Sequence, residues 1–132
     1  MPSMANITVK KNDGTTDVIY MAIQPSAGDK APAIWQNQTV GTAVAHRPEF
    51  SAVAQNNGTN TARRVSMSYV YPSLVTGSDG RVSVADKATF NGQFTLPKSM
   101  PKTDTDEAAT QLANLIASAL VKEMLKIGYS AS

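Results

Sequence analysis

The chain has 132 residues, 42% of them hydrophobic and 17% charged, with a formal net charge of +2. This length fits one domain, and so weak a positive charge does not by itself indicate nucleic-acid binding. The absence of cysteine excludes disulfides and thiolate metal sites. With no apolar run of membrane-spanning length and no signal-peptide pattern at Met1, we expect a soluble intracellular product.

The first part of the chain predicts a β-hairpin over residues 5–23. Two runs rich in β-branched and aromatic residues, 7–10 and 18–23, flank a turn at 11–14 whose Asp13-Gly14 step suits positive φ. The turn-rich stretch 25–32 leads into a strand at 34–40. A weaker, alanine-rich strand at 49–55 runs into the polar turn 56–60, which predicts a second hairpin.

The clearest strand patterns lie at residues 64–71 and 85–96. In both, polar and apolar side chains alternate, and a loop from Pro72 to Gly80 is expected between them. The apolar positions are Val65, Met67, Tyr69, Tyr71, Ala88, Phe90, Phe94 and Leu96. The polar positions are Arg64, Ser66, Ser68, Lys87, Thr89, Asn91, Gln93 and Thr95. The pattern predicts an antiparallel sheet over 33–97 that is covered on one side only.

Residues 103–128 predict the helical cover for that sheet. Pro97 and Pro101 end the strand, and the acidic stretch 103–107 offers caps for a helix that begins near Asp104. An apolar stripe of about 20 residues follows, formed by Ala108, Leu112, Leu115, Ile116, Ala119, Leu120, Met124 and Ile127. Gly128 ends the helix. Strands followed by helix predict an α+β fold, and its open sheet edges favour dimerisation.

No constellation of residues indicates an enzyme, a metal site or a cofactor site. His46, the one histidine, has no Cys, Asp or second His near it in sequence. The acids around Asp106 are explained by their place at a helix N-terminus. Ser66 and Ser68 lack the Gly-x-Ser-x-Gly pattern, and no phosphate-binding glycine loop occurs.

Arg63-Arg64 is the sharpest basic feature of the sequence. Arg64 shares a strand face with Ser66 and Ser68, and Lys87 begins the matching face of the next strand. Such a surface could hold phosphates on its cations and base edges or sugars on its neutral groups. The other reading of the same pattern is an ordinary exposed sheet face, which is normally polar.

Several short segments, in this order and spacing, resemble the coat proteins of the leviviruses, the small single-stranded RNA phages of the Q-beta type. The most specific are Thr105-Asp106-Glu107 and the Leu-Ala-rich run at 112–120. Lys11-Asn12-Asp13-Gly14, the pair Tyr71-Pro72, and Phe94-Thr95-Leu96-Pro97 add to the likeness. The resemblance covers nearly the whole chain.

The resemblance implies a single coat-protein domain over residues 1–132 with an N-terminal hairpin, a five-stranded antiparallel meander and C-terminal helices. The helices pack on the partner's sheet in an interlocked homodimer with ten strands. Such dimers assemble into an icosahedral shell that packages the phage's genomic RNA, and they bind an RNA hairpin that represses replicase translation. The expected location is the virion, assembled in the bacterial cytoplasm with a maturation protein as further partner and no membrane.

The resemblance also implies which residues do this work. RNA contacts fall on Arg64, Ser66, Ser68, Thr89 and Asn91, with Lys87 nearby. The dimer interface is expected to contain Leu112, Leu115, Ile116, Leu120, Phe90, Phe94, Met67 and Tyr69. The stretch 51–55 gives no clear match to the family's RNA-contacting strand, and the loop 73–82 has no cysteine for the inter-subunit disulfides of some relatives. A dimeric β-sheet regulator that binds nucleic acid without forming a shell is the alternative function.

Overall fold

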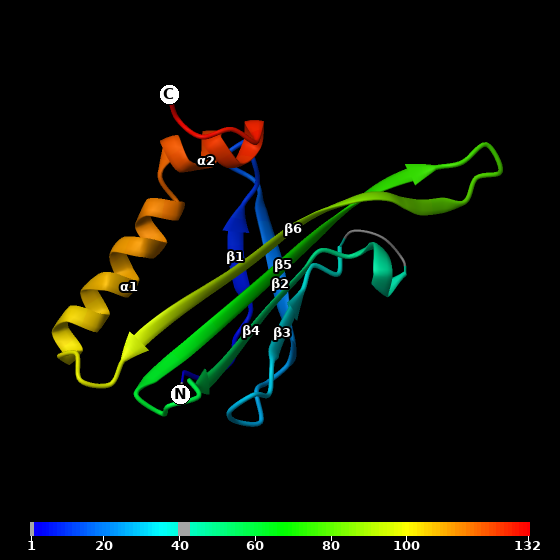
Figure 1. Ribbon diagram of the computed structural model, residues 1–132. Helices are drawn as coiled ribbons and strands as arrows, with labels where there is room; N and C mark the ends of the chain where they lie inside the picture. Colours follow the sequence, from blue (N-terminus) through cyan, green and yellow to red (C-terminus); the bar gives the residue numbers. More distant parts are fainter. Residues whose placement is uncertain (1, 40–42) are drawn as a thin grey trace. The chain divides into compact units, whose positions relative to one another are not determined.

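The computed structural model describes residues 2–39 and 43–132. Figure 1 shows strands followed by two helices. The elements are β1 (Ile7–Lys10), β2 (Asp17–Gln24), β3 (Ala33–Gln36), the 3-10 helix η1 (Val44–His46), β4 (Glu49–Asn56), β5 (Ala62–Thr76), β6 (Val82–Pro97), α1 (Lys102–Ile116) and α2 (Ala119–Ile127). They form two compact units, the first ending at Thr95 and the second running from Leu96 to Ser132. The expected α+β class is confirmed.

The strands form one six-stranded antiparallel sheet in the order β1-β2-β3-β4-β5-β6. We expected five strands beside a separate hairpin, and this count was wrong. The reason lies in β2, whose first half pairs with β1 while Met21 and Ala22 pair with Gln36 and Trp35 of β3. The hairpin strands are therefore the first two strands of the same sheet. Gly14, with φ 75°, closes their turn as the Asp-Gly step predicted.

Strand β5 is longer than its sequence pattern predicted, because it continues through Pro72 to Thr76. We expected a loop after Pro72. The last residue of β5 paired with β4 is Val70, which lies opposite Glu49. The N–H that Pro72 lacks is therefore not needed for a bond to β4. Beyond this point β5 and β6 continue as a two-stranded arm, which extends past the end of β4 in Figure 1.

The predicted strand at 34–40 is shorter in the structure. Strand β3 ends at Gln36, and residue 40 lies outside the described residues. Asn37 is only 4% exposed, and its backbone N–H donates to the carbonyl of Pro48. Its side-chain oxygen accepts from the backbone N–H and the hydroxyl of Thr39. These bonds hold a turn directly after Gln36, and the turn ends the strand.

One face of the sheet carries the aromatic side chains of the first unit. Phe50 is paired with Trp35 on one side and with Tyr69 on the other, and the rings of Trp35 and Phe50 are 5.6 Å apart. An apolar hollow of about 340 Å³ lies on this face, lined by Ile7, Val9, Tyr20, Phe50 and Tyr69. The N-terminal hairpin therefore reaches the aromatic residues of β4 and β5.

The C-terminal region contains two helices, as the resemblance implied, whereas the apolar stripe alone predicted one continuous helix. Helix α1 starts at Lys102 behind Pro101, which gives no side-chain cap, so the capping role expected of residues 103–107 was wrong. Ser118 adopts an extended conformation (φ −68°, ψ 153°) and caps α2, because its hydroxyl accepts from the N–H of Val121 at 3.4 Å. Gly128 ends α2 with φ 78°, as predicted. Within the described ranges, neither helix is both long and apolar enough to cross a membrane.

Candidate functional site

The register of β4 and β5 defines a polar face opposite to the aromatic one. Ser51 lies opposite Ser68, Val53 opposite Ser66, and Gln55 opposite Arg64. Directly paired residues in an antiparallel sheet point to the same side. The predicted alternation of β5 is therefore present, with its serines and Arg64 on one face and Met67 and Tyr69 on the other.

A second hollow, of about 400 Å³, lies on this polar face. It is lined by Ser51, Val53, Ser66, Met67, Ser68, Asn91, Gly92 and Gln93, so β4, β5 and β6 all contribute to it. We call it the polar hollow. Its volume falls within the range of about 300–1,000 Å³ that is usual for ligand sites. Three of the six residues predicted to contact RNA, Ser66, Ser68 and Asn91, thus meet in one place.

The other three predicted residues lie outside the lining of the polar hollow. Thr89 and Lys87 precede Asn91 on β6 by two and four residues, and Arg64 precedes Ser66 on β5. Period-two alternation puts each of them on the same face as its strand neighbour in the hollow. The structure therefore provides a neutral centre flanked by two cations. The RNA contacts themselves remain a prediction.

Three lining residues were not singled out from the sequence: Ser51, Val53 and Gly92. Gln93 was placed on the polar face but not among the RNA contacts. The stretch 51–55 gave no match because alanines at 52 and 54 hide the contrast between its two faces. The hydroxyl of Ser51 was nevertheless identifiable as the alternation partner of Glu49 and Gln55. Only the register with Ser68 shows that it lies beside the predicted site.

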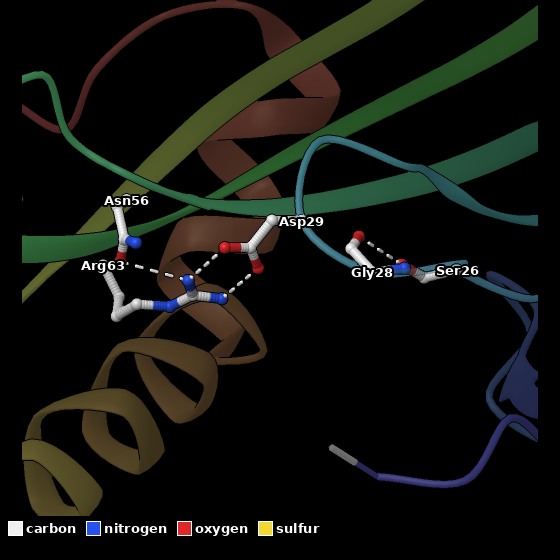
Figure 2. A network of polar contacts seen from close by, with 5 residues as sticks. All are labelled: Ser26, Gly28, Asp29, Asn56 and Arg63. Atoms are coloured by element: carbon white, nitrogen blue, oxygen red, sulfur yellow. Dashed lines mark hydrogen bonds and ion pairs between the residues drawn. The ribbon is translucent and has the colours of Figure 1, made fainter.

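Arg63 has a different role from its neighbour Arg64. Its Nη1 and Nη2 donate to the two carboxylate oxygens of Asp29 at 2.8 and 2.9 Å, and Nη1 also donates to Asn56 Oδ1 at 3.1 Å (Figure 2). The bonds to Asp29 raise the pKa of Arg63. Asp29 lies in the connection between β2 and β3, where the backbone N–H of Gly28 also donates to the hydroxyl of Ser26 (Figure 2). Arg63 therefore holds the β2–β3 connection against the β4–β5 hairpin.

Arg64 is half-buried, and one N–H group of its guanidinium lacks a hydrogen-bond acceptor in the described part of the chain. Its Nε is shielded from solvent and finds no hydrogen-bond acceptor in the part of the chain that the structure describes. A buried donor without an acceptor is costly, so an acceptor from outside the chain would be favourable here. Within the same described ranges, neither Arg64 nor Lys87 forms an ion pair with an acidic side chain. The two neighbouring arginines thus differ: Arg63 has a structural role, whereas Arg64 can still donate a hydrogen bond to an acceptor from outside the chain.

The residues predicted for the dimer interface keep much of their apolar surface exposed. Leu115 and Leu120 are 61% and 62% exposed, and Phe90 is 44% exposed. Leu112 and Ile116 are also exposed, whereas Met67, Tyr69 and Phe94 are half-buried. The four helical residues belong to the second compact unit and the other four to the first. Their role in dimerisation stays a prediction.

Acidic and histidine side chains do not converge in the described part of the chain. Residues 2–39 and 43–132 contain no group of three or more such side chains placed to hold a metal ion. His46 lies in η1, and the hydroxyl groups of the polar hollow have no histidine among the residues that line the hollow with them.

No family model matches the sequence, and no curated protein matches it. Solved structures do match its fold. The virus-like particle of Beihai levi-like virus 21 is 15% identical, with 99% of both chains covered and a TM-score of 0.82. That of bacteriophage NT-214 is 17% identical, covering 99% of this chain and 100% of that one, with a TM-score of 0.81. The bacteriophage GA capsid protein is 18% identical, covering 96% and 95%, with a TM-score of 0.76. The chain therefore has the fold of levi-like phage coat proteins, and at the level of that fold the resemblance seen in its sequence is confirmed.

Proposed function

We propose that this chain is a structural capsid protein of a levivirus-type RNA phage, which assembles from dimers into an icosahedral shell. The observation that carries the proposal is the likeness to virus-like particle subunits over 99% of both chains. An insertion or a missing element would leave part of one chain unmatched. The whole chain is thus accounted for by a fold that in those structures builds particles.

The dimer part of the proposal rests on surfaces that a single chain leaves open. Strand β6, 16 residues long, is last in the sheet order, so no strand from residues 2–39 or 43–132 lies beside one of its edges. A long open edge pairs readily with another copy. We expect the β6 strands of two copies to pair, and the helices of each copy to lie on the aromatic face of the other.

Exposure supports the same arrangement. In the residues that the structure describes, the only buried ones are Gln36, Asn37, Pro48, Ala62 and Pro72. A chain of this length normally buries about two thirds of its unfolded surface. Apolar side chains such as Leu115, Leu120 and Phe90 need a cover, and a second copy supplies one of the right size and chemistry.

The RNA part of the proposal rests on the polar face. Serine hydroxyls and the amides of Asn91 and Gln93 both donate and accept hydrogen bonds, as base edges and ribose require. Arg64 and Lys87 on the same face suit phosphates. We propose that this face packages genomic RNA and binds the hairpin that represses replicase translation, and that a maturation protein joins the same virion.

Expression of the chain alone in bacteria, followed by electron microscopy and nucleic-acid extraction, tests this function. We expect uniform round particles that contain RNA. A persistent free dimer that still binds RNA would overturn the shell and favour the alternative, a dimeric β-sheet regulator. Empty particles would leave the capsid role standing and remove RNA packaging.

A further inference from the structure

Two of the four tyrosines of the chain meet on the aromatic face of the sheet. Tyr20 lies on β2 and Tyr69 on β5, 49 residues later in the sequence. Their hydroxyl oxygens are 2.8 Å apart, and their ring centroids are 6.2 Å apart with the ring planes tilted by 55°. Both side chains are half-buried. The hydroxyl-bearing ends of the two rings are therefore held against each other.

The surroundings of this pair give the rings room to turn. Both rings line the apolar hollow of about 340 Å³, together with Ile7, Val9 and Phe50. Among the described residues that line this hollow, no other side chain carries a phenol or a sulfur atom. Tyr71, two residues further along β5, is 47% exposed and forms no ring contact with Tyr20 within residues 2–39 and 43–132. In the hollow, each phenol therefore has the other as its one reactive neighbour.

From this arrangement we infer that Tyr20 and Tyr69 are a site of oxidative modification, at which a one-electron oxidant joins the two rings as a dityrosine. Each phenol gives up one electron and its hydroxyl proton. The two phenoxyl radicals then form one carbon–carbon bond between the ring positions beside the hydroxyls. The hydrogens of these two carbons move to the phenolic oxygens, so the product keeps both hydroxyls and has lost two electrons and two protons overall. The link depends on the folded chain alone and not on the proposed capsid function.

Such a link ties β2 covalently to β5 in a chain that has no cysteine for a disulfide. It closes a loop between residues 49 positions apart in the sequence. By the chain-entropy argument used for disulfides, a loop of this size lowers the unfolding constant roughly a thousandfold. Because the hydroxyls are in contact before the reaction, the rings need only turn within the hollow to form the bond.

The experiment irradiates the full chain with a ruthenium tris-bipyridyl complex and persulfate. Each persulfate ion removes two electrons, one through the oxidised complex and one through a sulfate radical, which matches the two electrons lost in one link. Tyr69 is also expected at the dimer interface, and a sulfate radical is small enough to reach a half-buried ring. Dityrosine fluorescence measures the yield, and mass spectrometry of proteolytic peptides identifies the joined residues.

We expect a link between Tyr20 and Tyr69 of the same chain, with a yield about tenfold or more above that of the urea-denatured chain, because the fold holds the two rings together. The linked chain should unfold at higher urea than the unlinked chain. Absence of dityrosine, or equal yields in the folded and denatured chains, would overturn the inference. An unchanged urea midpoint of the linked chain would also contradict it, because a bond formed in the native arrangement must stabilise that arrangement.

Four variants assign the link to its residues. Tyr20→Phe and Tyr69→Phe should each abolish it, since each keeps the ring and removes one phenol. Tyr71→Phe and Tyr129→Phe are the matched controls and should both retain the link, although Tyr129 is 76% exposed and open to the oxidant. A bond from Tyr129 to another chain, or from Tyr71 to Tyr20, in place of the expected one would contradict the assignment. Near-ultraviolet circular dichroism before irradiation shows which variants fold, and either of the first two is sufficient for the test.

Discussion

The hydroxyl oxygens of Tyr20 and Tyr69 lie 2.8 Å apart, although β3 and β4 separate their strands in the sheet order. In a flat sheet, strands three steps apart are about 14 Å from each other. The first unit must therefore curl so that its aromatic face is concave, with the N-terminal hairpin turned towards β5. The two hydroxyls close this curl inside the apolar hollow.

Removing either hydroxyl of this pair should destabilise the fold. We expect Tyr20→Phe and Tyr69→Phe each to lower the free energy of unfolding by about 1 kcal/mol, since each leaves a half-buried hydroxyl without its partner. The double variant should lose hardly more than one single variant, which urea unfolding of all four proteins would measure. Tyr71→Phe is the matched control on the same strand. Strictly additive losses would show that the two hydroxyls are not coupled.

Burial and the bond to Tyr69 raise the pKa of Tyr20 well above its usual value of 10.0. A raised pKa means that the folded state favours the protonated phenol, so this stability is complete below pH 10 and is lost as the pH rises further. We expect the wild type to unfold over the alkaline pH range in which Tyr20 ionises. Ultraviolet absorbance measures this ionisation. In Tyr20→Phe, unfolding that still tracked the same ionisation would assign it to another group.

The first hairpin turn should lose stability in acid. The carboxylate of Asp13 accepts from the hydroxyl and N–H of Thr16 and from the N–H of Thr15, which lowers its pKa from 3.8 to about 2. A depressed pKa gives stability that is complete above about pH 4 and is lost as the pH falls towards 2. Thr16→Val should raise the pKa of Asp13, as measured by NMR titration, whereas Thr8→Val on β1 should not. An unchanged pKa in Thr16→Val would mean that the backbone bonds alone account for the shift.

Ser118, which is half-buried, should stabilise the fold as the N-cap of α2. Its hydroxyl accepts from the N–H of Val121, which would otherwise lack a partner in the first turn of α2. We expect Ser118→Ala to lower the free energy of unfolding by about 0.5–1 kcal/mol, with Ser118→Asp retaining most of it. Urea unfolding measures both. The same hydroxyl donates to the carbonyl of Leu115 at 2.6 Å, a bond that both variants lose, so equal losses would assign the effect to that bond and not to the cap.

A charge on the exposed stripe of α1 should block assembly. We expect Leu115→Asp to prevent dimers and particles, because an unpaired carboxylate cannot be buried against a partner's apolar surface. Thr110→Asp, on another face of the same helix, is the control and should assemble normally. Analytical ultracentrifugation measures both. Intact dimers of Leu115→Asp at wild-type affinity would place the interface elsewhere.

Local patterns predicted the elements that alternation or capping residues determine. The hairpin around Gly14, the two-faced strands β5 and β6, and the helix end at Gly128 belong to this group. The break at Ser118 was missed because the apolar period continues through it, and a serine is tolerated inside helices as well as at caps. The strand count was missed because β2 pairs on both edges, which its own sequence does not encode.

The sequence predicted only those residues of the candidate site that alternation within a single strand identifies. Ser66, Ser68, Asn91 and Gln93 were placed on the polar face by alternation, but Ser51 depends on the register between β4 and β5. Arg63 was grouped with Arg64 because the partner of Arg63, Asp29, lies 34 residues earlier in the chain. Contacts across such a separation follow from the folded connection and not from any local pattern.

The indole N–H of Trp35 donates to the carbonyl of Ala5 at 2.8 Å, while its ring lies beside Phe50. Trp35 is the only tryptophan in the sequence. Its fluorescence is therefore a built-in probe of a single place, the junction between the N-terminal segment and the aromatic face, and it reports on that junction without any added label.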